Sequence, residues 1–276
     1  MLYVETEREP AVAGRFYPAS RQVLAEEVAS FLAGRPDGRA TAEPPRPAFG
    51  LLAPHAGYTY SGQVAGATYA RVVVPDHVVV LCPNHTGVGK RVAAWPDGAW
   101  ATPLGRVPVD QAMTRELVET GLASPDREAH RHEHSLEVQL PFLQLRNPLV
   151  SIAALCLGPL SFERCEELGL QLARVARQHR ALVVASSDMS HYLPAALAWT
   201  KDHLALERML ALDPRGLHEV VSREGISMCG YVPATVMLVA AVEMGAREAE
   251  LIRYATSGDA TGDDRSVVGY AGVVVS

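Results

Sequence analysis

The chain has 276 residues, of which 48% are hydrophobic and 20% are charged, and its formal net charge is −6. This composition is ordinary for a globular protein, and the acidic balance argues against a nucleic-acid partner, which would favour a basic surface. No apolar run approaches the roughly 20 residues of a membrane span, and the charged start, residues 1–9, lacks the apolar stretch of a signal peptide. We therefore expect a cytoplasmic protein that interacts with neither nucleic acid nor membrane.

The first part of the chain predicts two helices separated by a loop and a strand. Apolar residues recur at helical spacing over 20–32, and the Pro/Gly-rich segment 34–47 predicts a surface loop. A buried strand is predicted over 49–53. The glycine-containing segment 57–62 predicts a loop, and a helix of small residues is expected to follow it over 63–72.

The rest of the chain alternates between further strands and helices. Asp110, Ser161 and Asp213 are suitable N-caps for three of the helices. In chain order, the predicted elements are the strand 77–81, the helix 110–119, the strand 149–157, the helix 162–178, the strand 181–185, a helix starting at 213–214, a helix up to 244, and the strands 249–256 and 267–275. This alternation predicts a single α/β domain over 1–276, with a mostly parallel or mixed central sheet covered by helices on both faces.

Side chains that can bind a metal or transfer a proton follow three of the predicted strands. His55 and His85 each come shortly after a buried strand. Asp188 and His191 follow a third strand, and Cys229 lies at the mouth of the last long helix. Because ligands of open α/β sheets bind outside the carboxyl ends of the strands, we expect these side chains to converge. Imidazole and thiolate are ligands for iron, copper or zinc, so a metal site is the first hypothesis.

Each of these residues also has a simpler interpretation. His55 and His85 are candidates for loop histidines bonded to backbone, and the segment 186–191 is compatible with a helix start capped by a serine. Cys229 is a candidate for a buried, inert thiol. A helix N-terminus would instead stabilise its thiolate, which suits either a metal ligand or a nucleophile. Asp188 is placed to orient His191.

Three histidines at alternate positions precede another predicted helix. His130 and His132 are expected at the surface, whereas His134 is expected to point inward, because it adjoins an apolar helix face. Tyr58 is expected to line a pocket near His55, and Asn84 is assigned to the same substrate pocket. The remaining cysteines are expected to be small buried apolar residues, and these are Cys82, Cys156 and Cys165.

Six segments that occur in the right order resemble the Memo family, which in prokaryotes is also called AmmeMemoRadiSam system protein B. The resemblance extends from about Pro10 to the last strand. The segments are PAVAGRFYP (10–18), APHAGYTYSG (53–62), PNH (83–85), EHSLE (133–137), SSDMSHY (186–192) and CG (229–230).

The resemblance implies a fold related to the LigB-type class III extradiol dioxygenases, which are non-haem Fe(II) enzymes. It implies that His55, His85 and Cys229 are the metal ligands and that His191 is an acid/base residue. Asp188 and His134 match motif positions near the same pocket, which makes them further catalytic candidates. Cys229 stands where the dioxygenases have a carboxylate, and this softer ligand shifts the preference towards copper or a more electron-rich iron. Fe(II) is the expected metal, and copper is the alternative.

Three functions follow from these observations. The first is a metal-dependent oxidoreductase that acts on a small molecule, aromatic in the dioxygenase-like case, or on a peptide. The second is a cysteine hydrolase, with Cys229 as nucleophile and His191 or His55 as base. The third is a non-catalytic binding module, because the family name records an association with a radical-SAM enzyme and an AMMECR1-like protein as partners.

Overall fold

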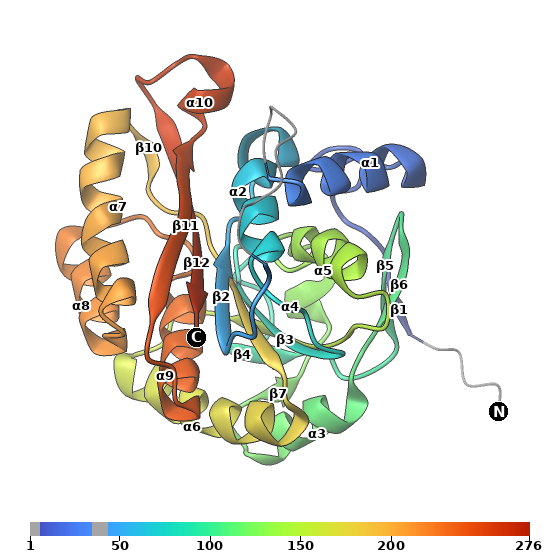
Figure 1. Ribbon diagram of the computed structural model, residues 1–276. Coiled ribbons are helices and arrows are strands. Elements are labelled where there is room, and N and C mark those ends of the chain that lie inside the picture. Colours follow the sequence, from blue (N-terminus) through green and yellow to red (C-terminus); the bar gives the residue numbers. More distant parts are fainter. Residues whose placement is uncertain (1–5, 35–43) are drawn as a thin grey trace.

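The computed structural model describes residues 6–34 and 44–276, and its centre is a mixed sheet with helices on both sides (Figure 1). Four neighbouring strands in the middle of this sheet are parallel. They are, in spatial order, β2 (Gly50–Ala53), β9 (Leu182–Ser186), β3 (His77–Pro83) and β8 (Ser151–Leu157). All four are almost completely buried, as expected for parallel strands covered on both faces.

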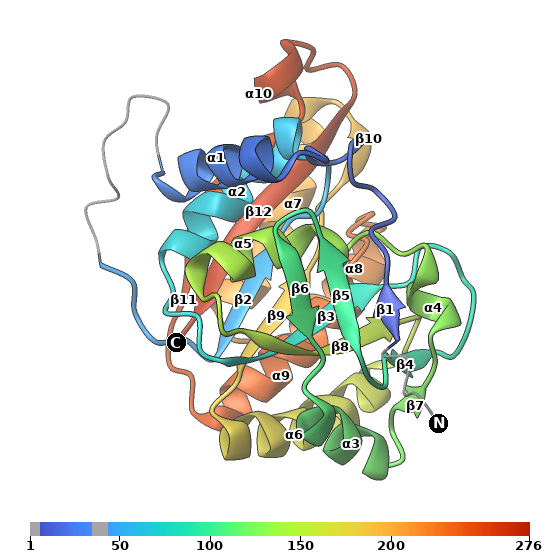
Figure 2. The ribbon, with the colours of Figure 1, turned by 90° about the vertical axis from the view of Figure 1, so that its right-hand side faces the viewer.

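Further strands extend the sheet on both sides. The strand β12 (Val267–Val275) pairs antiparallel with β2, and β11 (Ala249–Thr256) and β10 (His191–Leu193) pair antiparallel with β12. On the other side, β4 (Val92–Ala94) pairs antiparallel with β8, and β7 (Ser124–Pro125) pairs parallel with β4. A separate small sheet contains β1 (Glu7–Arg8), β5 (Ala99–Thr102) and β6 (Gly105–Pro108), as Figure 2 shows.

Two hydrophobic cores form on opposite faces of the sheet, because successive residues of each strand point to opposite sides. Leu52, Val79 and Leu81 belong to one core, whereas the adjacent Leu51 and Val80 belong to the other. The first core includes residues of α3 (Gln111–Glu119), α6 (Phe162–His179), α7 (Ala195–Leu210), α8 (Pro214–Glu224) and α9 (Tyr231–Met244). The second includes residues of α1 (Arg21–Leu32), α2 (Tyr58–Ala70) and α5 (Leu140–Arg146). The short helices are α4 (Glu128–Arg131), the 3-10 helix η1 (Glu137–Gln139) and α10 (Gly258–Thr261).

The predicted α/β class and the helices on both faces are confirmed, but the start of α2 was predicted too late. The helix begins at Tyr58 rather than after a loop over 57–62, and its first turn is hydrogen-bonded to Gly57. Gly62 is needed for close helix packing rather than for a turn. A Cβ atom at this position would collide with the ring of Phe31 in α1.

Other differences concern segments without a strong periodic signal. Helix α7 and the short strands were not predicted, and residues 35–43 of the predicted loop 34–47 lie outside the described residues. No helix starts in the segment 186–191. The backbone amides of this segment form hydrogen bonds with other parts of the chain instead. The Ser190 amide donates to the buried Asp202 carboxylate at 2.9 Å, and the Met189 amide donates to Gly269 O at 2.8 Å.

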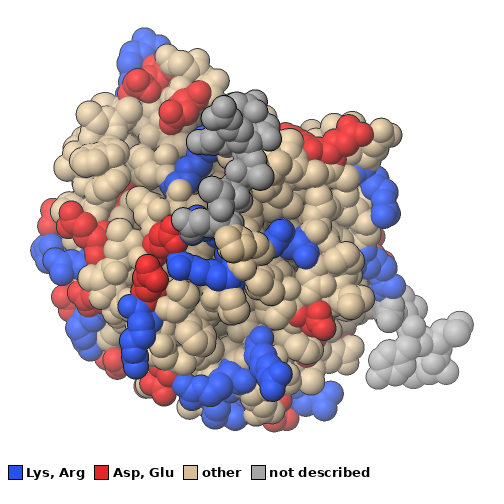
Figure 3. Space-filling view, viewed as in Figure 1, with Lys and Arg blue, Asp and Glu red and all other residues tan. Residues whose placement is uncertain are grey.

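In the described part of the chain, no helix combines the length and the apolar character that crossing a bilayer requires. On the face of the molecule seen in Figure 3, basic and acidic side chains are interspersed.

The N-terminal segment is attached to the domain by the buried carboxylate of Glu137. This carboxylate pairs with Arg8, and it accepts hydrogen bonds from the Ala11 amide at 2.8 Å, the Val12 amide at 3.0 Å and the Tyr17 hydroxyl at 2.6 Å. Both members of the ion pair are buried, so each one compensates the charge of the other. The attachment fixes the segment that follows, which contributes to the candidate site.

We predict that Glu137→Ala lowers the free energy of unfolding by about 3–5 kcal/mol, because it leaves the Arg8 guanidinium buried without its counter-charge. Urea unfolding followed by circular dichroism measures the change. Glu119→Ala, at an exposed helix position, is the control and should cost less than about 0.5 kcal/mol. Equal unfolding midpoints for the two variants would contradict the prediction.

Candidate metal centre

The candidate site lies where the central parallel strands end. Ala53 of β2 is in register with Ser186 of β9, and Leu81 of β3 is in register with Ala185, so the three chain segments leave the sheet side by side. These segments carry His55, Asp188 and His85. Cys229 joins them from the turn that precedes α9.

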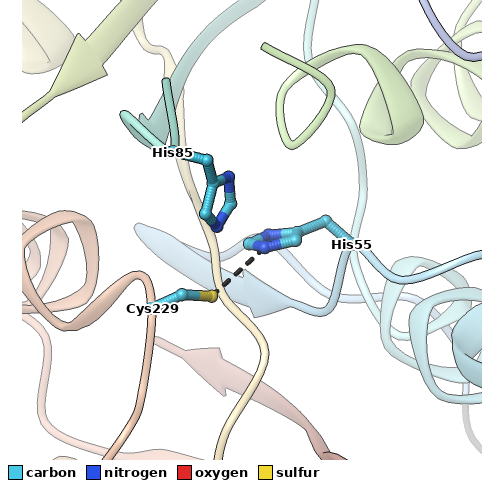
Figure 4. Close-up of side chains that lie close together, drawn as sticks. All are labelled: His55, His85 and Cys229. Atoms are coloured by element: carbon cyan, nitrogen blue, oxygen red, sulfur yellow. Dashed lines mark hydrogen bonds between the residues drawn. The ribbon is translucent and has the colours of Figure 1, made fainter. Parts of the chain in front are cut away.

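The three predicted metal ligands, His55, His85 and Cys229, meet at this edge. One ligand atom of each lies within 4.8 Å of the others, and Figure 4 shows the side chains pointing towards one another. The Nε2 atom of His55 is 3.2 Å from the sulfur of Cys229. The rings of His55 and His85 have centroids 5.2 Å apart.

The hydrogen bonds of His55 fix which ring nitrogen carries the proton. The Ser186 hydroxyl donates to Ser135 O at 2.6 Å, so its oxygen accepts from His55 Nδ1, which lies 2.9 Å away. The side-chain amide of Gln139 donates to the same oxygen at 2.8 Å. Nε2 therefore keeps a free lone pair that faces Cys229. Burial, followed by the neighbouring His134 and His85, lowers the pKa of His55 well below its usual value and keeps the ring neutral.

His85 is held by the buried carboxylate of Glu133. Its Nδ1 lies 2.9 Å from one carboxylate oxygen, and its backbone amide donates to the other at 2.6 Å. Ser135 donates to Glu133 through both its amide and its hydroxyl. Burial raises the pKa of Glu133, but the hydrogen bonds from His85 and Ser135 outweigh this effect and lower the pKa to about 2. A carboxylate that orients a histidine in this way is a common partner of metal ligands.

Cys229 lies close to the mouth of α9, but the expected stabilisation of its thiolate is outweighed by other effects. Burial, followed by the charge of Asp188, raises the pKa of the thiol well above its usual value. The Asp188 amide, which donates to the sulfur at 3.3 Å, offsets only part of this effect. Burial and Asp188 therefore disfavour the thiolate that a free cysteine nucleophile needs.

The remaining catalytic candidates surround this cluster. The Asp188 carboxylate accepts a hydrogen bond from the His55 amide at 2.7 Å, and burial raises its pKa to about 6. Asp188 was expected to orient His191, but His191 forms its hydrogen bonds with Ser227 instead. His191 Nδ1 donates to Ser227 O at 2.9 Å, and the Ser227 hydroxyl accepts from the His191 amide. The ring of His134 stacks on His85 with centroids 5.0 Å apart.

A cavity of about 490 Å³ opens beside His55 and His85 of this cluster. Four predicted site histidines line it together with Asp188, Arg15, Phe16, Tyr60 and Tyr192, and these histidines are His55, His85, His134 and His191. Tyr58, which was expected there, is buried instead, and its hydroxyl donates to Val138 O at 2.7 Å.

Asn84 is also absent from the described lining of this cavity, because it stabilises its own turn. Its side-chain oxygen accepts hydrogen bonds from the Thr86 hydroxyl and the Gly87 amide, both at 2.9 Å. The side-chain amide of Asn84 donates to Val88 O at 2.8 Å.

The structure also corrects the prediction for His130. This residue is fully buried beside Trp95 and Trp100, and its Nε2 is 3.1 Å from Ala93 O. Its two tryptophan neighbours belong to a part of the chain that is distant in sequence. His132 is exposed and His134 is partly buried, as expected. Three cysteines are buried as predicted, namely Cys82, Cys156 and Cys165.

The sequence pattern assigned no role to Glu133 or Ser227, and it suggested only a helix cap for Ser186. For Ser186 and Glu133, the only available signal was their position inside the quoted motifs. Ser227 lies outside these motifs and just before Cys229.

Comparison with known proteins identifies the family. A family model described as Memo-like protein matches residues 8–274. The chain belongs to the Memo family. A MEMO1 family protein of Methanopyrus kandleri is 43% identical over 278 residues, with 97% of this chain and 98% of the relative covered. One of Aquifex aeolicus is 40% identical over 268 residues, with the same coverage.

The fold also occurs in a solved structure. The crystal structure of an uncharacterized protein from Escherichia coli K12 superposes with a TM-score of 0.54 at 16% identity. The match covers 80% of this Memo family chain and 98% of the other chain. At this level of sequence identity, the similarity shows a shared fold and nothing more.

We predict that Ser186→Ala changes the tautomer of His55, because it removes the acceptor of the Nδ1 proton. In the unsubstituted protein, long-range ¹H–¹⁵N NMR of labelled histidine should show one tautomer with the proton on Nδ1. The variant should show both tautomers in exchange. Ser61→Ala, which removes a hydroxyl bonded to Ala56 O, should leave His55 unchanged. An unprotonated Nδ1 in the unsubstituted protein would contradict the assignment.

Proposed function

We propose that this Memo family protein is a metal-dependent oxidoreductase that holds Fe(II), or alternatively copper, on His55, His85 and Cys229. The observation that carries the proposal is the meeting of these three donors within 4.8 Å of one another. Both imidazoles have their Nδ1 atoms engaged by buried acceptors, which leaves each Nε2 free to bind a cation.

The donor set fits such a metal. Imidazole suits iron and copper, and thiolate adds a soft ligand that favours copper or electron-rich iron. Three protein ligands leave further coordination positions open. A bound metal would supply one-electron redox chemistry with dioxygen as the oxidant. The charge of a cation would also stabilise the Cys229 thiolate, opposing the effects of burial and Asp188.

The residues of the chain around this position have separate roles in the proposal. His191 is oriented through Nδ1, so its Nε2 is available to take or give a proton in the cavity. The aromatic side chains Phe16, Tyr60 and Tyr192 suit a small planar substrate or the tip of a peptide side chain. A radical-SAM enzyme and an AMMECR1-like protein are the partners expected if the protein is instead a non-catalytic binding module.

The cysteine hydrolase alternative has less support. It needs a thiolate at Cys229, and burial and Asp188 both disfavour that form. A non-catalytic module would bind the same metal without turnover, so turnover is the measurement that separates it from the oxidoreductase.

We predict that protein prepared anaerobically binds one equivalent of Fe(II) at this site, and that nitric oxide gives it the EPR signal of a high-spin iron–nitrosyl. His85→Ala should lower the iron affinity by more than about 100-fold, since it removes a ligand rather than a group that orients one. His132→Ala, at an exposed histidine, is the matched control. Folded protein that takes up neither iron nor copper would refute the proposal.

We predict a different effect for His191→Gln, because its ring orients towards the cavity through Ser227 and is not part of the ligand cluster. Iron affinity should stay within about threefold of the unsubstituted protein. The rate of oxygen consumption should fall by about 10²–10⁴, measured on the catechol that the unsubstituted protein oxidises fastest. Loss of iron from this variant, or an unchanged rate, would exclude the acid/base role. Tight iron binding without oxidation of any substrate would favour the binding module.

A further inference from the structure

A second group of metal-binding side chains lies at the opposite edge of the central sheet. His77 is the first residue of β3, and His179 is the last residue of α6, shortly before β9. The two strands start side by side, because Val78 is in register with Leu182. The Asp110 amide donates to Ile152 O at 2.8 Å, which places this residue at the start of the neighbouring β8.

The side chains of these three residues face one another. One ligand atom of each lies within 4.8 Å of the others. Asp110 caps α3 with one carboxylate oxygen, which accepts from the Met113 amide at 2.9 Å. Its other oxygen lies 2.6 Å from Nδ1 of His77. The rings of His77 and His179 have centroids 5.8 Å apart.

A fourth donor, Glu116 of α3, adjoins the group. One of its carboxylate oxygens lies 2.9 Å from Nε2 of His179. The other is buried and has no hydrogen-bond partner among the described residues. A buried carboxylate oxygen without a partner is costly, and a bound cation would remove this cost. This observation is independent of the clustering of the other three residues.

Access and charge also suit a cation. The side chain of His77 is 43% exposed, whereas those of Asp110 and His179 are 8% and 16% exposed. His77 is therefore the ligand that a cation from solvent would meet first. The two carboxylates together carry the charge that balances a divalent ion.

We propose that His77, Asp110 and His179, with Glu116 as fourth ligand, bind a divalent cation of the zinc class. Two imidazoles and two carboxylates form a set of four protein ligands, and a set without an open position is typical of a structural rather than a catalytic site. The cation connects the start of β3 with α3 and α6, which lie side by side at this end of the domain (Figures 1 and 2). This site is separate from the His55–His85–Cys229 cluster and is expected to stabilise the fold.

The experiment uses the full chain carrying His85→Ala and Cys229→Ala, so that the first site no longer competes. After removal of metals with EDTA, this protein should bind one equivalent of Zn²⁺ in a calorimetric titration. Its Tm should rise by about 5 °C when free Zn²⁺ is a hundredfold above the Kd. Co²⁺ should give d–d absorption without a thiolate charge-transfer band, because the site contains no sulfur.

Two further substitutions in that background locate the site. His77→Ala, at the most exposed ligand, should lower the Zn²⁺ affinity by at least about 10-fold. Glu116→Gln keeps an oxygen for the contacts of Glu116 with Gln178 and His179 but removes the charge, and should also weaken binding. His132→Ala is the control and should bind as tightly as its parent. Folded parent protein without Zn²⁺ binding, or unchanged binding in His77→Ala, would overturn the proposal.

Discussion

The register of the four central parallel strands determines where most side chains of the two candidate sites lie. Each of these strands is hydrogen-bonded on both sides and buried on both faces, so its ends cannot shift without breaking the ladder. The carboxyl edge collects His55, His85 and Asp188 from segments that are far apart in sequence. The amino edge collects His77 and His179 in the same way. Both candidate sites are therefore consequences of strand pairing.

Buried hydrogen bonds then determine how the histidines at the carboxyl edge are oriented. Ser186, Glu133 and Ser227 O each accept a hydrogen bond from Nδ1 of one ring, which leaves the Nε2 atoms of His55, His85 and His191 available. Burying the Glu133 carboxylate is unfavourable by itself, but its hydrogen bonds compensate for this, as its low pKa indicates. The orientation of the rings is thus set before any ligand binds, which is the condition for a precise metal site.

The sequence was sufficient to predict the α/β class and the convergence of His55 and His85, because both follow from strand order and strand ends. Cys229 was added to these two as a ligand through the resemblance to the Memo family. It was insufficient for contacts that depend on distant segments. His130 is buried by tryptophans from another part of the chain. The error at Tyr58 has a local cause. Once α2 starts at Tyr58, residues two positions apart point about 200° apart around the helix, so Tyr60 rather than Tyr58 faces the cavity.

The central claim is that His55, His85 and Cys229 jointly bind a redox-active metal. A crystal structure of the iron-loaded protein, with anomalous diffraction measured on both sides of the iron absorption edge, tests this claim most directly. The account predicts one anomalous peak in contact with Nε2 of both histidines and with the sulfur of Cys229. An iron peak bound elsewhere, or an iron-soaked crystal with ordered side chains and no peak at this position, would contradict it.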